Sequence, residues 1–156
     1  MNAPYCILLA EGHRLLRQEI IRIIEEIQGT KVVGAVGSGP ELFEFLEIFI
    51  PDLLILDISL PRLRALEATR EIRDRFPNLA VLILTLDRDG EYPDQALAAG
   101  AQGCLLKQDA DLELPPAINA LRQGRIFLSA RLETNGEKKT SRLFLPRIPT
   151  GNNLPY

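Results

Sequence analysis

Three polar residues, an aspartate, a threonine and a lysine, each follow an apolar run of the length of one strand. The runs Leu53–Leu56, Val81–Leu84 and Cys104–Leu106 are followed by Asp57, Thr85 and Lys107, respectively. Continuous apolar runs bounded by turn residues are typical of strands buried on both faces of a parallel sheet. Since ligands of open α/β sheets bind at the carboxyl ends of the strands, a carboxylate, a hydroxyl and an ammonium are expected to meet at one sheet edge.

These three groups could carry out phosphoryl transfer. A carboxylate such as that of Asp57 can attack phosphorus and form an acyl phosphate. The charge on the transferred group then needs a cation and a hydroxyl nearby, which Lys107 and Thr85 could supply. A hard cation such as Mg2+ prefers carboxylate and carbonyl oxygens, and Glu11 offers a carboxylate directly after the first apolar run. Asp57 alone would more simply be a solvated residue at a strand end, so the hypothesis depends on all three strand ends together.

Strand and helix patterns alternate five times in the chain. Strands are expected at Tyr5–Ala10, Lys31–Val36, Asp52–Asp57, Ala80–Thr85 and Gly103–Leu106, and helices at about 12–27, 38–49, 64–76, 91–99 and 114–123. This alternation predicts an α/β fold, a flavodoxin-like (βα)5 doubly wound parallel sheet with strand order 2-1-3-4-5. Residues 1–130 are expected to form one domain. Residues 131–156 contain several prolines, glycines and asparagines without an amphipathic period, and are predicted to be a linker or flexible tail.

Composition and charge narrow the classes of function. The chain is 46% hydrophobic and 25% charged, as is ordinary for a soluble protein, and no apolar stretch is long enough to span a bilayer. With no signal peptide and two cysteines expected as free thiols, a cytoplasmic location is predicted. Residues 1–130 hold 13 basic and 19 acidic residues, hence −6, whereas residues 131–156 hold five basic and two acidic, hence +3. We therefore expect no membrane binding and no specific nucleic-acid binding by this chain alone.

Five segments of the chain carry a resemblance to a known family. They are Leu8–His13, Val32–Gly34, Pro51–Asp57, Leu66–Arg70 and Ala99–Lys107. In this order and spacing they resemble the CheY-like receiver domain of two-component response regulators over roughly residues 5–130. The resemblance is closest to the subfamily in which a LuxR-type helix-turn-helix follows the receiver.

The resemblance implies a role for each site residue. Asp57 would be the phosphoacceptor, Thr85 the switch hydroxyl and Lys107 the phosphate-pairing lysine. Glu11, Asp57 and the backbone carbonyl of Ser59 would hold Mg2+. The protein would be a signalling switch and not an enzyme, phosphorylated by a histidine kinase or phosphotransfer protein and acting on a downstream, transcriptional output. The resemblance is also compatible with a homodimer, and with a longer regulator in which an effector domain follows residue 156.

The sequence departs from the family pattern at three positions. The family has two acidic residues after the first strand, but here Glu11 is followed by Gly12, so weak Mg2+ binding is expected. Cys104 stands where the family carries an aromatic switch residue, and Ala65 replaces the usual glycine after the phosphorylation loop. These departures leave open an alternative, a pseudo-receiver that acts as a phosphorylation-independent protein-interaction module.

Two enzyme classes fit the sequence less well. An aspartate-nucleophile phosphohydrolase needs a second aspartate two residues after the nucleophile, where this chain has Ser59. A dinucleotide oxidoreductase needs a glycine fingerprint, and the segment Gly34–Gly39 has neither of the phosphate-loop spacings. His13 is expected to be solvated or to cap a helix. The apolar residues between Leu42 and Phe49 are expected to be mostly core, with one or two exposed aromatics as a candidate partner patch.

Overall fold

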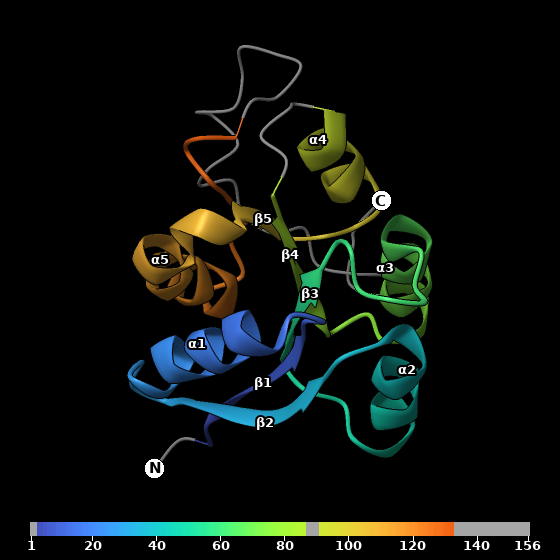
Figure 1. Ribbon diagram of the computed structural model, residues 1–156, viewed down its shortest axis with the longest axis horizontal. Helices are drawn as coiled ribbons and strands as arrows, with labels where there is room; N and C mark the ends of the chain where they lie inside the picture. The colour runs from blue at the N-terminus through green and yellow to red at the C-terminus, as the bar shows by residue number, and fades with distance from the viewer. Residues whose placement is uncertain (1–2, 87–90, 133–156) are drawn as a thin grey trace, which may run out of the picture.

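A single parallel sheet lies between two layers of helices in the computed structural model, which describes residues 3–86 and 91–132 (Figure 1). The elements in chain order are β1 (Tyr5–Ala10), α1 (Arg14–Glu25), β2 (Thr30–Val36), α2 (Gly39–Ile48), β3 (Leu53–Asp57), α3 (Ala65–Arg75), β4 (Ala80–Thr85), α4 (Glu91–Ala98), β5 (Gly103–Leu106), the 3-10 turn η1 (Lys107–Asp109), α5 (Ala110–Arg122) and β6 (Phe127–Leu128). The strand order is β2-β1-β3-β4-β5-β6, and each neighbouring pair is parallel. The predicted flavodoxin-like sheet is confirmed, with one strand more than expected.

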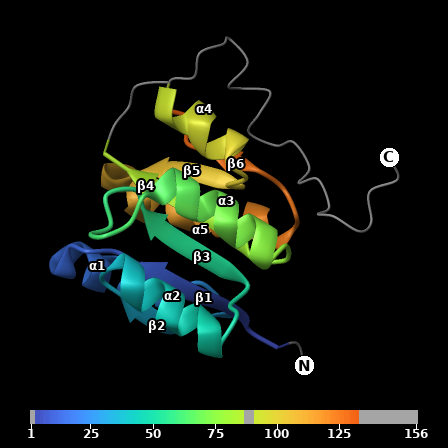
Figure 2. The same cartoon turned by 90° about the vertical axis from the view of Figure 1, so that its right-hand side faces the viewer.

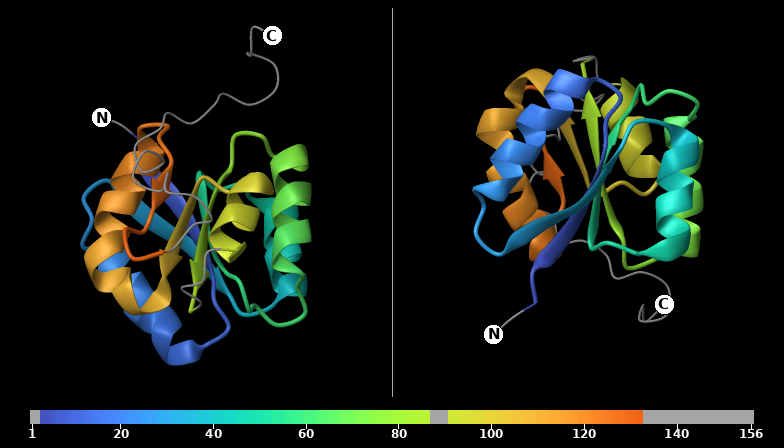
Figure 3. Two further views of the ribbon diagram at one scale, coloured as in Figure 1. Left: turned by 90° about the horizontal axis from the view of Figure 1, so that it is seen from above. Right: turned by 60° about the horizontal axis from the view of Figure 1, so that its bottom comes forward.

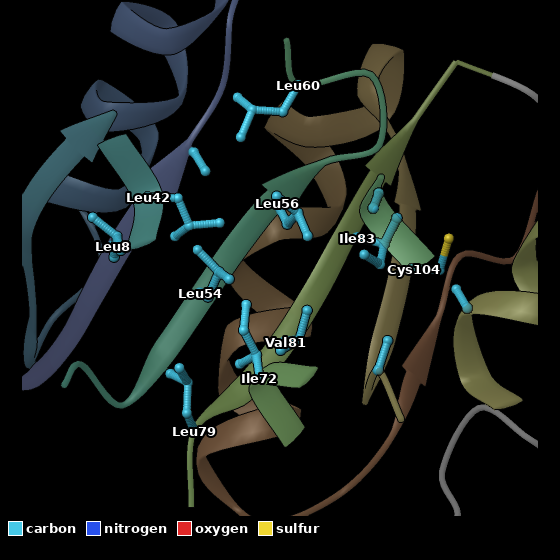
Figure 4. Close-up of a cluster of buried hydrophobic side chains, with 14 of the residues drawn as sticks. Leu8, Leu42, Leu54, Leu56, Leu60, Ile72, Leu79, Val81, Ile83 and Cys104 are labelled. Carbon is cyan, nitrogen blue, oxygen red and sulfur yellow. The ribbon is translucent and has the colours of Figure 1, made fainter. Parts of the chain in front are cut away.

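Each face of the sheet packs against its own set of helices. Helices α1 and α5 cover one face and α2, α3 and α4 cover the other (Figures 2 and 3). The cluster under α2 to α4 includes Leu54, Leu56 and Val81 from the central strands and Leu42 and Ile72 from the helices (Figure 4). Strands β3 and β4 are buried along their whole length, as the unbroken apolar runs predict.

Two helix starts agree with their sequence signals. The side chain of His13 accepts a hydrogen bond from the backbone amide of Leu16 (3.3 Å), so His13 caps α1, one of its two expected roles. The hydroxyl of Ser38 accepts one from the amide of Glu41 (3.4 Å), and Pro40 lies in the first turn of α2. Both caps anchor loops next to the carboxyl edge of the sheet.

The predicted start of the last helix was wrong. Helix α5 begins at Ala110, not near Leu114, and contains Pro115 and Pro116 within it. The two prolines cannot donate the helical hydrogen bonds that end on Asp111 and Leu112, but both of these residues are exposed, so water can solvate their carbonyls. The buried positions of the helix, which include Leu114 and Ile118, hold it against the sheet.

The sixth strand was not predicted. Strand β6 is two residues long, too short for a periodic signal, and pairs with β5. The amide of Ser129 then donates to the carbonyl of Cys104 (3.0 Å), and Leu132 is fully buried. Backbone hydrogen bonds and burial therefore extend to Leu132, and the predicted domain boundary near residue 130 stays a prediction. The rest of the predicted linker, residues 133–156, lies outside the described residues.

Strand β2 forms the other edge of the sheet and is irregular. Ile7 is aligned with Val32 and Leu8 with Gly34, so Val33 is an extra residue in the ladder. A Cβ atom at Gly34 would lie 2.5 Å from Cε2 of Phe45, so glycine permits this close approach of α2. None of the described helices has the length and apolar character needed to cross a membrane.

Candidate functional site

The register of the sheet brings the predicted residues to one edge. Ala10 is aligned with Leu56, so the next residues, Glu11 and Asp57, are neighbours. The ammonium of Lys107 lies 2.8 Å from Oδ1 of Asp57 and 3.3 Å from Oε2 of Glu11. Asp57 and Lys107 thus lie together at the carboxyl edge, as expected, and Glu11 lies beside them.

Asp57 is almost fully buried, and one of its carboxylate oxygens accepts several hydrogen bonds. Oδ1 accepts hydrogen bonds from the backbone amide and the hydroxyl of Ser59, both at 2.9 Å, in addition to the contact with Lys107. The contact of the Ser59 hydroxyl was not anticipated, although an aspartate that accepts from the backbone amide two residues on is a common local turn. Within the described part of the chain, the hydrogen bonds and the ion pair found for this carboxylate all fall on Oδ1.

The two carboxyl groups have pKa values shifted in opposite directions. Burial alone would raise the pKa of Asp57, but hydrogen bonds from Lys107 and Ser59 outweigh it and hold the pKa below its usual value. Burial raises the pKa of Glu11, the charge of Asp57 adds to this, and the amide of His13 and the ammonium of Lys107 only partly oppose it. Asp57 is therefore the better ionised of the two.

Glu11 is fully buried, and its two oxygens differ. Oε2 accepts from the amide of His13 (3.1 Å) and pairs with Lys107. Oε1 is buried and has no hydrogen-bond partner among the described residues. A buried carboxylate oxygen without a donor is unfavourable, and a cation or an ordered water would satisfy it.

Thr85 ends β4 on the same edge. It is 1% exposed and is aligned with Leu106, the residue before Lys107. The carbonyl of the preceding residue, Leu84, accepts from the amide of Ile58 (2.9 Å), so the ends of β3 and β4 are joined directly beyond Asp57. The hydroxyl of Thr85 thus lies at the expected strand end, and its role toward a phosphoryl group stays a prediction.

An open pocket lies over these groups. It has a volume of about 350 Å3 and is lined by Glu11, Gly12, His13, Asp57, Ser59, Pro61, Leu86 and Lys107. Gly12, the residue after Glu11, faces Pro61. A Cβ atom at Gly12 would lie 2.7 Å from Cδ of Pro61, so the proline ring closes the space beside this glycine. This contact was not detectable in the sequence, because it joins two loops far apart in the chain.

The donor set fits a divalent cation only in part. Glu11 and Asp57 bring two negative charges, of which Lys107 balances one, and Oε1 of Glu11 has no partner among the described residues. Oxygen-rich, net negative sites of this kind suit Mg2+. No cluster of three or more histidine, cysteine or acidic residues that could hold a metal occurs in the described part of the chain. The residues present therefore fit Mg2+ with fewer charged ligands than a site with a third carboxylate.

Comparisons with known proteins agree with this geometry. The model of the response regulator receiver domain matches residues 7–119. The transcriptional regulatory protein DegU of Brevibacillus brevis is 33% identical over 138 residues, which are 88% of this chain and 58% of DegU. The chain thus spans a little over half the length of that relative.

Solved structures agree as well. The isolated receiver domain of RcsB from Salmonella enterica serovar Typhimurium, in the presence of the phosphomimetic BeF3−, has a TM-score of 0.77 at 26% identity and covers 83% of this chain and 99% of that one. A two-component response regulator of the LuxR family from Aurantimonas sp. SI85-9A1 has a TM-score of 0.76 at 30% identity, covering 82% and 91%.

Proposed function

Because the chain belongs to the response regulator receiver family, we propose that Asp57 accepts a phosphoryl group from a histidine kinase or phosphotransfer protein and thereby switches a transcriptional output. The observation that carries the proposal is the buried contact of 2.8 Å between Lys107 and Asp57, inside a pocket that opens to solvent. It combines an ionised nucleophile with a cation beside the point of attack.

The chemistry follows from the state of the two oxygens of Asp57. Oδ1 holds the carboxylate in place through Ser59 and Lys107. Oδ2 attacks phosphorus, and the electron pair of the breaking P–N bond of a phosphohistidine stays with the donor imidazole. Lys107 then stabilises charge on the phosphoryl oxygens and Thr85 closes toward them. Mg2+, held by Glu11, Asp57 and the backbone carbonyl of Ser59, would supply further charge neutralisation.

A switch is favoured over a turnover enzyme. Ser59 occupies the position at which a phosphohydrolase would carry its second aspartate, and its hydroxyl is engaged by Asp57 at 2.9 Å. General acid–base catalysis of acyl phosphate hydrolysis by that position is therefore absent. The phosphorylated form would last long enough to shift an equilibrium between two conformations.

The test uses a small phosphodonor. The full chain is incubated with acetyl phosphate and Mg2+, and phosphoryl uptake is followed by intact mass. Wild type is expected to gain one phosphoryl group, Asp57→Asn none, and the control Asp74→Asn, which changes an exposed aspartate of α3, the same as wild type. Uptake that survives in Asp57→Asn would place the acceptor elsewhere.

A second candidate function is a pseudo-receiver that works by protein interaction alone. It is favoured by one observation, the closure of the space beside Gly12 by Pro61, where the family has a second acidic residue. In that case the wild-type protein stays folded but gains no phosphoryl group in the same incubation, whether Mg2+ or Mn2+ is added. A homodimer stays a prediction for either function.

A further inference from the structure

The short turn η1 carries two charged side chains that contact different parts of the protein. Lys107, its first residue, reaches Asp57 and Glu11 at the phosphoacceptor site. Asp109, its last residue, lies 3.0 Å from Nε of Arg131 through its Oδ2. Only Gln108 separates the two, so a few backbone bonds join the two contacts.

The backbone of Arg131 is held against the sheet. The amide of Ser129 donates to the carbonyl of Cys104 in β5 (3.0 Å), and the amide of Leu132 donates back to the carbonyl of Ser129 (3.1 Å). The amide of Arg131 itself donates to the hydroxyl of Ser129 (3.4 Å). Since Leu132 is fully buried, the guanidinium projects from a fixed turn rather than from a free chain.

The ion pair is asymmetric in its exposure. The side chain of Asp109 is 13% exposed, whereas that of Arg131 is 53% exposed. Oδ2 of Asp109 is buried and has no aligned hydrogen bond, so the charge of Arg131 is its compensation. A largely buried carboxylate is more sensitive to loss of its cation than an exposed one.

From this connection we propose that Arg131 is a positioning residue for phosphoryl transfer, which acts through Asp109 on the placement of the Lys107 ammonium at Asp57. The proposal rests on the proposed function. Coupling between two sites is reciprocal, so a phosphoryl group that draws Lys107 toward it would also change the Asp109–Arg131 contact. Arg131 is followed by Leu132, the last described residue, so the ion pair would join the state of Asp57 to the carboxyl-terminal end of the described domain.

The first experiment compares phosphorylation rates of full-length variants. Arg131→Gln is expected to lower the rate at saturating acetyl phosphate by about two- to fivefold with an unchanged KM for the donor, since a partly exposed pair acts weakly. Arg131→Lys, which keeps the charge, should retain most of the rate. The matched control is Arg75→Gln, which removes a guanidinium that pairs with Glu47 and Glu71 far from the site.

The second experiment separates positioning from a general effect on the fold. In a Lys107→Ala background, Arg131→Gln should cause no further change in rate, because the side chain through which it acts is gone. The same fold-change in both backgrounds, or no change in either, overturns the proposal.

A readout without phosphorylation keeps the two proposals apart. If wild type gains no phosphoryl group, the proposed function has failed, and the NMR resonance of the Lys107 side-chain nitrogen then decides the inference. A shift of this resonance in Arg131→Gln but not in Arg75→Gln supports positioning of Lys107 by Arg131. An unshifted resonance overturns it.

Discussion

The loops on the two sides of Asp57 differ in how they bring charge to it. The loop after β1 offers the single carboxylate of Glu11, one oxygen of which has no partner among the described residues, and then Gly12 packed against Pro61. The turn after β5 offers Lys107, which contacts two carboxylates, and Asp109, which pairs with Arg131. The loop after β1 thus supplies one carboxylate that lacks a full set of partners, whereas both charged side chains of the turn after β5 form ion pairs.

This difference bears on the proposed phosphoryl transfer. Asp57 and Lys107 pair directly, whereas the loop after β1 carries only the carboxylate of Glu11. Under the proposed function, charge neutralisation at Asp57 would therefore depend more on Lys107 and less on Mg2+ than it would with two acidic residues in that loop. Variants on each side should show this imbalance.

The largest expected effect on stability comes from Lys107→Ala. It leaves two neighbouring buried carboxylates without their cation, which should lower the free energy of unfolding at pH 7 by about 1 to 3 kcal/mol. The pKa values of both carboxyls then rise above their unfolded values, so the stability of the variant should increase as the pH falls below 7. Chemical denaturation across pH measures this, with Lys31→Ala on the exposed edge strand as control.

Lys107→Ala also tests the division of roles at the site. The folded variant is expected to accept a phosphoryl group on Asp57 without switching, because the nucleophile is retained and the coupling cation is lost. Stability equal to that of wild type would contradict the assigned importance of the turn after β5.

On the other side of the site, Gly12→Asp should change metal binding. Compared with the isosteric control Gly12→Asn, it is expected to bind Mg2+ about tenfold more tightly, since a third carboxylate joins the site. Both variants should lose stability, because the new Cβ atom would lie 2.7 Å from Cδ of Pro61 and the ring must move. Isothermal titration gives the affinities, and equal values for the two variants would argue against a metal site in this loop.

Glu11→Gln should have a smaller effect and of opposite sign to that of Lys107→Ala. Burial raises the pKa of Glu11, so its ionised form destabilises the fold at neutral pH. Without Mg2+, the amide should therefore raise the free energy of unfolding at pH 7 by about 1 kcal/mol. The exposed Glu25→Gln serves as control, measured in the same denaturation series.

The same variant isolates the pH dependence that Asp57 contributes. Wild-type Glu11 adds stability below its ordinary pKa of 4.5, and this contribution disappears as the pH rises through its higher folded value. Asp57, whose folded pKa is lowered, adds stability above its ordinary pKa of 3.8 and loses it as the pH falls further. As the pH falls from neutral toward 4.5, wild type should therefore gain a contribution that Glu11→Gln lacks, whereas below pH 3.8 both should lose the contribution of Asp57.

The smallest effect is expected from His13→Ala. This change removes the side-chain cap of α1, a contact of 3.3 Å, and should lower stability by about 0.5 kcal/mol. The backbone amide of residue 13 still donates to Glu11, so Mg2+ affinity should not change. His13→Asn can cap the helix in place of histidine and should recover the stability. Equal thermal unfolding midpoints for His13→Ala and wild type would show that the cap does not stabilise α1.

The sequence was sufficient for those features that arise from local patterns. Asp57 and Lys107 were found because each follows an apolar run that can only be a buried strand, and parallel strands bring their ends together. The start of α5 was wrong because Pro115 normally signals a first turn, whereas the buried face of the helix extends to Ala110. Burial in the tertiary structure overrode the local signal there.

Contacts between distant loops could not be predicted. Pro61 against Gly12 and Arg131 against Asp109 each depend on where separate loops lie over the sheet edge, and neither pair has a characteristic spacing. Strand β6 was missed for a related reason, since Phe127–Leu128 is too short for a periodic pattern and becomes a strand only because the edge of β5 is available. These features need three-dimensional information.

The extra residue in β2 has a consequence for self-association. An exposed strand edge can template the addition of a strand from another molecule, which leads to aggregates. In β2 the bulge at Val33 interrupts the ladder, and the exposed Lys31 places a charge on the same edge. At the opposite edge β6 offers two paired residues before the chain turns away. Both edges of the apolar sheet therefore disfavour the addition of strands from other molecules. This should keep the domain from aggregating at high concentration.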